Sequence, residues 1–172
     1  MNPITRKTSC SSRWAFTLVE AVVSLLIVGA MLVATLSTVG ASRLSKYTIS
    51  EHSRGQLLAQ PLMAEILQQD YSDPNDTPVF GIESGESTTT RVDFDDVDDH
   101  NGWVSNPPEQ KDGTQISDLT GWERSVTVEW VNPDDVTQVL GSESNAKRIT
   151  VNVSFNNKNV ASLVAIRIHY GL

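Results

Sequence analysis

Five aspartates near the middle of the chain offer the oxygen ligands that a hard cation prefers. Carboxylates are the usual protein ligands of Ca²⁺, which takes six to eight oxygens. The spacing does not fit an EF-hand loop, because Gly102 falls one position late when Asp96 is the first ligand, and no Glu closes the loop. The stretch therefore predicts either a calcium site of another kind or a solvated acidic loop. Its members are Asp93, Asp95, Asp96, Asp98 and Asp99.

A single carboxylate, Glu20, precedes a long apolar run. The 22 residues from Ala21 to Ser42 carry no charge. As a helix they would extend about 33 Å, enough to cross a hydrocarbon core of about 30 Å. An acid in a membrane span is energetically unfavourable and is therefore a functional candidate. A simpler role also fits, because Thr17 and Glu20 have the spacing of a capping box, which would satisfy free amides of the first helical turn.

Two ordinary kinds of apolar segment compete with a functional one. A secretory signal peptide has an apolar core of about 7 to 15 residues, shorter than this run. A plain single-pass anchor would explain the hydropathy and the preceding cations Arg6, Lys7 and Arg13, but it leaves Glu20 unexplained. Because those cations precede the span, the positive-inside rule places the leader in the cytoplasm and the rest of the chain outside.

The start of the chain resembles the class III signal of type IV prepilins and type II secretion pseudopilins. The resemblance rests on a basic leader, a small residue and an apolar helix that opens with Phe16, Thr17, Leu18, Val19 and Glu20. It implies that a prepilin peptidase cuts between Ala15 and Phe16 and methylates Phe16. It also implies that Glu20 pairs with the terminal amine of a neighbouring subunit during assembly. Ala15 departs from the glycine that is usual before the cut.

Two stretches are also similar to the minor pilins of mannose-sensitive haemagglutinin type pili, the D-protein group. They are residues 94–103, with their paired aspartates and terminal Gly-Trp, and residues 146–153 before the last predicted hairpin. The wider family resemblance implies a long helix packed on a small antiparallel sheet. It also implies a link to calcium, because major pseudopilins bind it in a comparable region.

The chain divides into four expected segments. They are a leader over residues 1–15, a transmembrane helix over 16–42, a helical continuation over 43–70 and an acidic β domain over 71–172. In the continuation, Leu58, Leu62 and Ile66 recur at helical spacing and predict one apolar face. Gly55 and Pro61 predict interruptions, and Pro61 in particular predicts a kink or a join between two helices.

Alternating apolar residues predict strands over 88–94, 125–131, 148–155 and 160–170. Four polar residues, 156–159, predict a hairpin turn between the last two strands. The predicted fold class is therefore α+β, a pilin-like arrangement in which the distal half of a long N-terminal transmembrane helix packs on a small antiparallel sheet. In each predicted strand, a set of residues is expected to lie on one face. The sets are Thr90, Val92 and Phe94; Val126, Val128 and Trp130; Ile149, Val151, Val153 and Phe155; and Val164, Ile166, Ile168 and Tyr170.

Charge and composition argue against several functions. After Ser42 there are 10 Lys and Arg against 20 Asp and Glu, so a broad basic face for nucleic acid is not expected. The three histidines are far apart, the single cysteine is Cys10 in the leader, and no catalytic motif occurs, so no enzyme is predicted. Trp103, Trp122 and Trp130 are expected to serve packing rather than a binding platform.

These observations predict a minor type IV pilin or pseudopilin, held in the bacterial inner membrane with its C-terminal domain in the periplasm and then built into a pilus or pseudopilus. The expected partners are other pilin subunits, prepilin peptidase, the inner-membrane assembly machinery and the lipid bilayer. No cofactor other than a possible calcium ion is expected. The alternative is an unprocessed, single-pass anchored binding module whose acidic loop binds calcium or another ligand.

Overall fold

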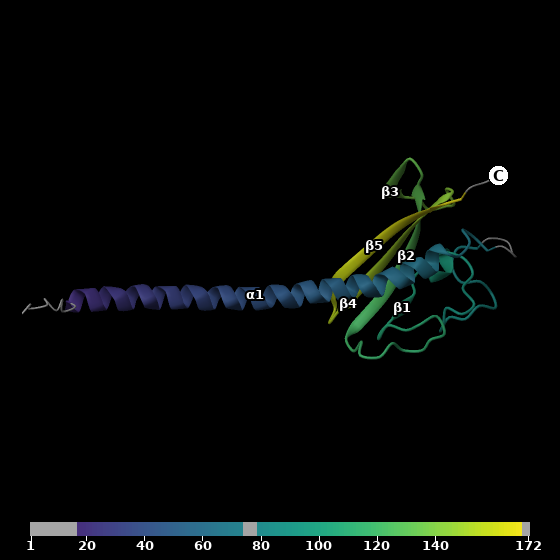
Figure 1. Ribbon diagram of the computed structural model, residues 1–172. Helices are drawn as coiled ribbons and strands as arrows, with labels where there is room; N and C mark the ends of the chain where they lie inside the picture. The colour runs from purple at the N-terminus through teal and green to yellow at the C-terminus, as the bar shows by residue number, and fades with distance from the viewer. Residues whose placement is uncertain (1–16, 74–78, 170–172) are drawn as a thin grey trace, which may run out of the picture. The chain divides into compact units, whose positions relative to one another are not determined.

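The computed structural model describes residues 17–73 and 79–169. The chain forms one long helix followed by a five-stranded antiparallel sheet (Figure 1). It divides into two compact units, Met1–Lys46 and Tyr47–Leu172. The class is α+β, as the sequence predicts.

The first unit holds the amino-terminal part of helix α1 (Leu18–Leu67). Its segment Leu18–Gly40 has a mean hydropathy of 2.4 and is long and apolar enough, by length and composition, to span a membrane. Large apolar side chains here are exposed around the helix, including Leu25, Met31 and Leu36. A helix that is apolar on every side is suited to apolar surroundings rather than to water.

Helix α1 runs without a break through both of its expected interruptions. The prediction that Pro61 marks a join between two helices is wrong, because Pro61 lies inside the continuous helix. The Pro61 side chain is exposed, while the neighbouring residues Ala59, Leu62 and Met63 are buried in the core. Burial of these neighbours stabilises the helix enough to outweigh the one backbone hydrogen bond that a proline removes.

Gly55 is a contact point rather than a helix breaker. A Cβ at this position would lie 2.9 Å from Val160 Cγ2 and 3.0 Å from Ala161 Cβ. The absence of a side chain therefore lets α1 approach the sheet closely. Beside this contact, His52 Nδ1 is hydrogen-bonded to the carbonyl of Val160.

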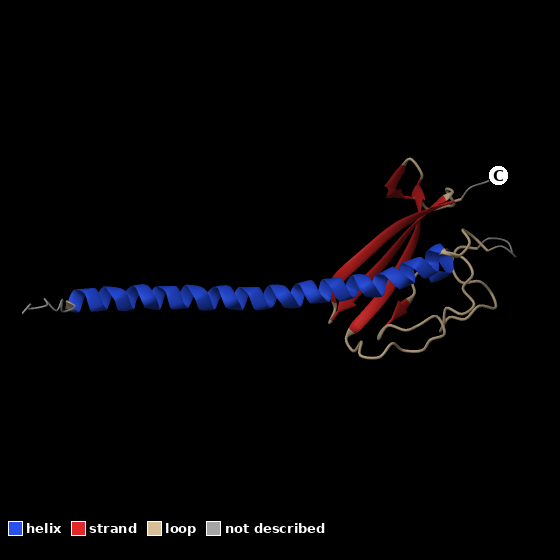
Figure 2. Cartoon of the chain, viewed as in Figure 1, coloured by secondary structure: helices blue, strands red, loops and turns tan. Residues whose placement is uncertain are grey.

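The sheet has the strand order β1-β2-β4-β5, with β3 paired to the far end of β2. All neighbouring strands are antiparallel. Figure 2 shows the strands in red beside the helix. Val126 of β2 lies opposite Val151 of β4. The strands are β1 (Val104–Ser105), β2 (Trp122–Asn132), β3 (Asp135–Val139), β4 (Ala146–Phe155) and β5 (Lys158–Ile168), and a 3-10 turn, η1 (Asp98–His100), precedes β1.

The core lies between the distal half of α1 and one face of this sheet. Apolar residues of α1 meet residues that alternate along β2 and β4, as the period-two pattern predicts. The buried set includes Ala59, Leu62, Met63 and Ile66 from the helix and Val126, Val128, Ile149, Val151 and Val153 from the strands.

The last hairpin differs from its prediction in two details. Its turn is Asn156-Asn157 alone, both at positive φ (48° and 63°), because Lys158 already pairs with Phe155. The register then shifts near Val153, so Ala161, Leu163 and Ala165 pack against the core. The face predicted to carry Val164 and Ile168 is the outer one, since these side chains are 60% and 45% exposed.

The predicted strand over 88–94 is wrong, because this segment forms bends. Its backbone is engaged locally, with Thr90 N donating to Ser87 Oγ at 3.1 Å. Such side-chain bonds compete with strand pairing. The burial does not follow the predicted alternation either, since Arg91 is buried and Val92 is exposed.

Candidate functional site

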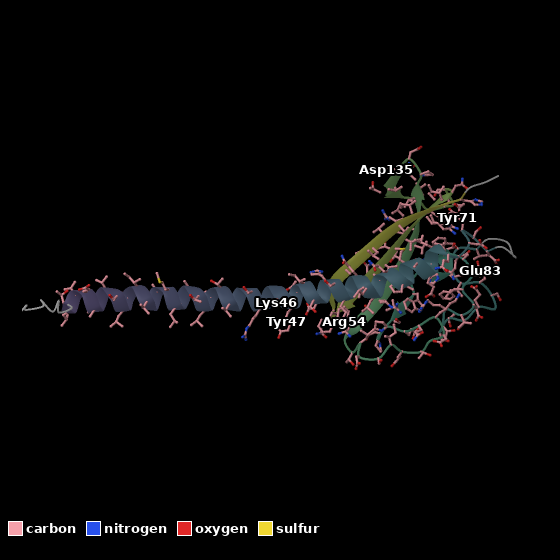
Figure 3. All side chains as sticks on the ribbon, in the orientation of Figure 1. Lys46, Tyr47, Arg54, Tyr71, Glu83 and Asp135 are labelled. Atoms are coloured by element: carbon pink, nitrogen blue, oxygen red, sulfur yellow. The ribbon has the colours of Figure 1, made fainter. Side chains whose placement is uncertain are left out.

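The structure gathers acidic side chains from two segments that are separate in sequence. Two groups of three carboxylates form, each with ligand atoms within 4.8 Å of one another, and both include Asp99. We call their five members the carboxylate cluster: Glu83, Glu86, Asp95, Asp96 and Asp99. Figure 3 labels Glu83 in the irregular segment that contributes the two glutamates.

The aspartate side of the cluster is shaped by side chains that bond to their own backbone. Asp96 Oδ1 accepts hydrogen bonds from the amides of Asp98 (2.7 Å) and Asp99 (3.3 Å). Asp99 Oδ2 accepts from the amides of Asp95 (3.0 Å) and Asp96 (3.1 Å). These reciprocal bonds fix the turn that contains η1.

A backbone bridge ties this turn to the segment that follows α1. Asp70 N donates to Asp95 O at 3.2 Å, and Val97 N donates to Asp70 O at 3.1 Å. On the opposite side, Glu86 Oε2 accepts from the amide of Glu83 at 2.9 Å, which curls the glutamate segment towards the cluster. The cluster is thus a product of tertiary folding and not of one local motif.

Two oxygens of the cluster are buried without a hydrogen-bond partner in the described part of the chain. They are Asp99 Oδ1 and Glu83 Oε1. Asp99 as a whole is only 1% exposed. A buried carboxylate oxygen that accepts no hydrogen bond is energetically unfavourable, which favours the protonated form of a neighbouring carboxyl group such as Glu83.

The carboxylates raise one another's pKa. Burial, followed by the Asp99 carboxylate, raises the pKa of Glu83 to about 8. Burial, followed by the charges of Asp98 and Asp99, raises the pKa of Asp96 to about 8. The pKa of Glu86 and that of Asp95 are also raised, with burial as the largest cause. The site therefore resists full ionisation in the absence of a cation.

Two of the five aspartates proposed from sequence lie outside both groups. Asp93 is exposed on the surface. Asp98 instead forms a buried ion pair with Lys147 of β4, and its Oδ2 accepts from the amide of Gly81 at 3.0 Å. Glu83 and Glu86, which the sequence did not single out, take part instead. Their only local signal is a pair of glutamates in a polar segment beside Gly85.

The second candidate site is Glu20, in the first turn of α1. The Glu20 amide donates to Thr17 Oγ1 at 3.3 Å, which is one of the two bonds of the capping box that the spacing predicts. Across residues 17–73 and 79–169, no group pairs with the Glu20 carboxylate. Ala15 and Phe16, the expected processing pair, lie outside the described residues.

His100 and the tryptophans of the described domain contact neighbouring side chains of the fold. His100 is fully buried, its Nε2 lies 2.6 Å from Gln69 Oε1, and burial with the charges of Arg91 and Lys111 lowers its pKa to about 3. Trp103 packs under the Arg91 guanidinium at 4.1 Å from the ring centre. Trp122 is 4% exposed within the core. Trp130 packs against Phe80, with their ring centroids 4.5 Å apart.

A hollow with a volume of about 550 Å³ lies beside β1. Glu109 is the one ionisable residue in its lining, so it offers no acid and base pair for catalysis. Polar, uncharged residues also line this hollow, among them Thr88, Thr89, Asn101 and Asn106.

No known family, curated protein or solved structure matches this chain. Any assignment of function must therefore rest on the residues themselves. Two features of the described chain bear on it: an apolar helix with one carboxylate at its start, and a carboxylate cluster on the sheet domain.

Proposed function

We propose that the protein is a minor type IV pilin or pseudopilin, a structural subunit that enters a pilus or a type II secretion pseudopilus after processing by prepilin peptidase. One observation carries the proposal. Glu20 begins an apolar helix that is long enough to span a membrane, and its carboxylate has no partner within the described residues. The resemblance of residues 16–20 to the prepilin signal supplies the partner, the terminal amine of a neighbouring subunit.

The electrostatics favour such a pairing. A carboxylate at the centre of a membrane-spanning helix costs about 2.5 to 3.5 kcal/mol on insertion scales, and less near the interface. A cation that approaches it in an apolar surrounding offsets that cost. The apolar surface of Leu18–Gly40, which is exposed in the single chain, would be covered by the equivalent helices of neighbouring subunits.

The remaining assignments follow from the same proposal. The subunit waits in the bacterial inner membrane with its acidic domain in the periplasm, and later decorates the filament. Its partners are other pilin subunits, prepilin peptidase, the assembly machinery and the bilayer, with no direct role for nucleic acid. Its proposed work is assembly rather than catalysis.

A second candidate function is favoured by the carboxylate cluster. The chain would then be an unprocessed single-pass anchor that presents a binding domain. Its ligand site would be the cluster itself, where two buried carboxylate oxygens have no partner in the described chain. This candidate assigns Glu20 no role beyond the start of the helix.

Substitution of Glu20 separates the two candidates. Glu20→Gln keeps the size of the side chain and the Thr17 cap but removes the charge. Under the filament proposal, the variant inserts and folds normally, yet its incorporation into sheared filaments falls at least about tenfold, because the charge pairing is lost. Immunoblots of filament and membrane fractions provide the measurement.

Thr17→Ala is the matched control. It removes the helix cap, which is worth about 1 kcal/mol, and leaves the carboxylate in place. Incorporation close to that of the unmodified chain is expected. If Glu20→Gln assembles as well as this control does, Glu20 has no pairing role and the anchored module is the better account.

A further inference from the structure

We propose that a second hollow in the sheet domain binds a free tetrahedral oxyanion of the phosphate and sulfate class, held by Arg124, Arg91 and Lys111. This hollow has a volume of about 310 Å³, and we call it the arginine hollow. Its charged lining comes from α1 (Glu65), from β2 (Arg124) and from irregular segments (Arg91, Glu109 and Lys111). The proposal does not depend on whether the chain assembles into filaments.

The two arginines carry more charge into the interior than the chain neutralises there. Arg91 is 1% exposed and Arg124 is 4% exposed. Arg91 has a full counter-charge, because its Nε and Nη2 donate to the two oxygens of Glu65 at 3.0 and 3.3 Å. Arg124 forms no salt bridge with any described residue. A guanidinium taken out of water without a carboxylate is energetically unfavourable, so this charge favours an anion as its partner.

Arg124 keeps its positive charge at neutral pH despite this burial. Burial, followed by the charge of Arg91, lowers the pKa of Arg124 to about 10, while the charges of Glu65 and Glu109 act in the opposite direction. The group is therefore still protonated near pH 7, where Arg91 repels it. An aromatic ring offsets this repulsion only in part: the centre of the Trp103 ring lies 4.1 Å from Arg91 Cζ and 5.7 Å from Arg124 Cζ.

Each arginine also has one buried nitrogen that donates to no acceptor in the described part of the chain. These nitrogens are Arg91 Nη1 and Arg124 Nε. The other nitrogens are in use, since the Nη2 atoms of both arginines donate to the carbonyl of Glu109, and Arg124 Nη1 donates to the carbonyl of Leu58 at 3.5 Å. Buried N–H groups in folded proteins are nearly always paired, so these two favour an acceptor beside them.

Lys111 adds a third, exposed cation to the lining. It lies on a tight turn, in which the amide of Gln110 donates to the carbonyl of Thr114 at 2.8 Å. The turn is joined to the first arginine, because the amide of Arg91 donates to the carbonyl of Lys111 at 3.1 Å. The Lys111 ammonium donates to the carbonyl of Phe94 at 3.3 Å but forms no salt bridge within the described ranges. An exposed cation beside buried ones attracts anions from solution.

Two acids share the lining with these three cations, so the arginine hollow has one net positive charge. Glu65 is bound to Arg91, whereas Glu109 forms no salt bridge with a described residue. The chain as a whole has a formal net charge of -8, so a positive hollow stands out from its surroundings. Glu109 is the one carboxylate that could compete with a bound anion for Arg124, which gives the experiment below a variant with the opposite sign.

The donors that remain suit a tetrahedral anion better than a carboxylate. A carboxylate binds best to two parallel N–H groups of one guanidinium. Arg91 already presents such a pair to Glu65, and both Nη atoms of Arg124 donate to carbonyls. A single N–H on each arginine remains, together with the ammonium of Lys111. Phosphate and sulfate have oxygens in four directions and can accept from several side chains at once.

The test uses the full-length protein at pH 7, in micelles of a detergent that has no phosphate or sulfate group, after dialysis into sodium chloride. Phosphate and sulfate also stabilise proteins through exclusion from their surface, so binding is measured directly, by equilibrium dialysis with radioactive phosphate. Ionic strength is held constant with chloride so that general screening is equal in all samples. We expect saturable phosphate binding that sulfate displaces and that acetate displaces at least about tenfold less well.

Four variants identify the site, and near-ultraviolet circular dichroism in chloride establishes that each is folded. Arg124→Gln should weaken phosphate binding at least about tenfold, because it removes the buried charge that has no carboxylate partner. Lys111→Gln should weaken binding about threefold, and its exposed position keeps the test valid if loss of the buried arginine prevents folding. Glu109→Gln should instead strengthen binding about threefold, because a competing carboxylate is removed.

Lys158→Gln is the matched control. It removes the same charge as Lys111→Gln from an exposed position outside the lining, and it should bind phosphate within about twofold of the unmodified protein. The proposal is overturned if the unmodified protein binds no phosphate at millimolar concentration, or if acetate displaces phosphate as well as sulfate does. It is also overturned if Lys111→Gln binds no more weakly than Lys158→Gln, if a folded Arg124→Gln binds unchanged, or if Glu109→Gln binds more weakly than the unmodified protein.

Discussion

At the scale of single residues, Lys147 shows how this small domain places a charge in its interior. The side chain is almost fully buried on β4 and donates to Asp98 and to the carbonyl of Tyr71, with its ammonium 4.3 Å from the centre of the Tyr71 ring. Each charge is thus matched by a partner, and η1 is joined to the sheet through one ion pair. Removing either partner would leave the other buried and unmatched.

Lys147→Met tests this pairing. We expect it to lower the free energy of unfolding by about 3 to 5 kcal/mol, because Asp98 stays buried without its cation. The double variant Lys147→Met/Asp98→Asn should be less destabilised than the single one, because the unpaired charge is removed. Urea unfolding followed by circular dichroism gives both values. If the single variant loses less than about 0.5 kcal/mol of its free energy of unfolding, the ion pair does not stabilise the fold.

Residue types alone predicted part of the candidate site. The aspartate run indicated where carboxylates gather, and Asp95, Asp96 and Asp99 do belong to the cluster. The sequence could not exclude Asp98, because its partner Lys147 comes from a strand far along the chain. It could not include Glu83 either, since the approach of segment 79–90 is set by tertiary contacts and by no local pattern.

At the scale of elements, the contact between α1 and the sheet depends on Gly55. In sequence a glycine and a proline in one helix suggest breaks, because both lower intrinsic helix propensity. In the structure the buried face of Ala59, Leu62 and Ile66 stabilises the helix across them. Helical spacing predicted that face correctly. The sequence around Gly55 could not predict its role, because the residues that a side chain there would meet, Val160 and Ala161, lie in β5.

Gly55→Leu should destabilise the domain by about 1 to 3 kcal/mol, the usual range for overpacking. The reason is that a Cβ at this position already lies 2.9 Å from Val160 Cγ2 and 3.0 Å from Ala161 Cβ. Gln56→Leu on the exposed side of the same helix is the control, with an expected change within about 0.5 kcal/mol. Equal unfolding midpoints for the two variants would contradict the close approach.

Alternation of apolar and polar residues predicted the long strands β2 and β4 but not the short segment 88–94. β2 and β4 alternate buried and partly buried residues over most of their length, so period two predicted them well. Segment 88–94 has a similar pattern but forms bends, because Ser87 binds local amides and the buried Arg91 pairs with Glu65 of α1. A short alternation beside Ser and Thr is therefore weak evidence for a strand.

At the scale of the whole chain, the two compact units differ in the side chains they expose. Met1–Lys46 contains an exposed apolar helix, and Tyr47–Leu172 contains the sheet, its core and the carboxylate cluster. The filament proposal explains why both belong to one chain: the first unit would pack among neighbouring helices, and the second would lie outside the membrane. Hydropathy predicted the first unit directly, since a long apolar run is the strongest signal in the sequence.

If this chain is a processed filament subunit, a prepilin peptidase must cleave it, and the intact mass of the co-expressed protein shows whether it does. We expect a product that begins at Phe16 and carries one added methyl group, with Ala15 accepted before the cut. A catalytically inactive peptidase, as control, should leave the chain at full length. A full-length, unmethylated product in the presence of the active peptidase would rule out processing and, with it, the proposed function.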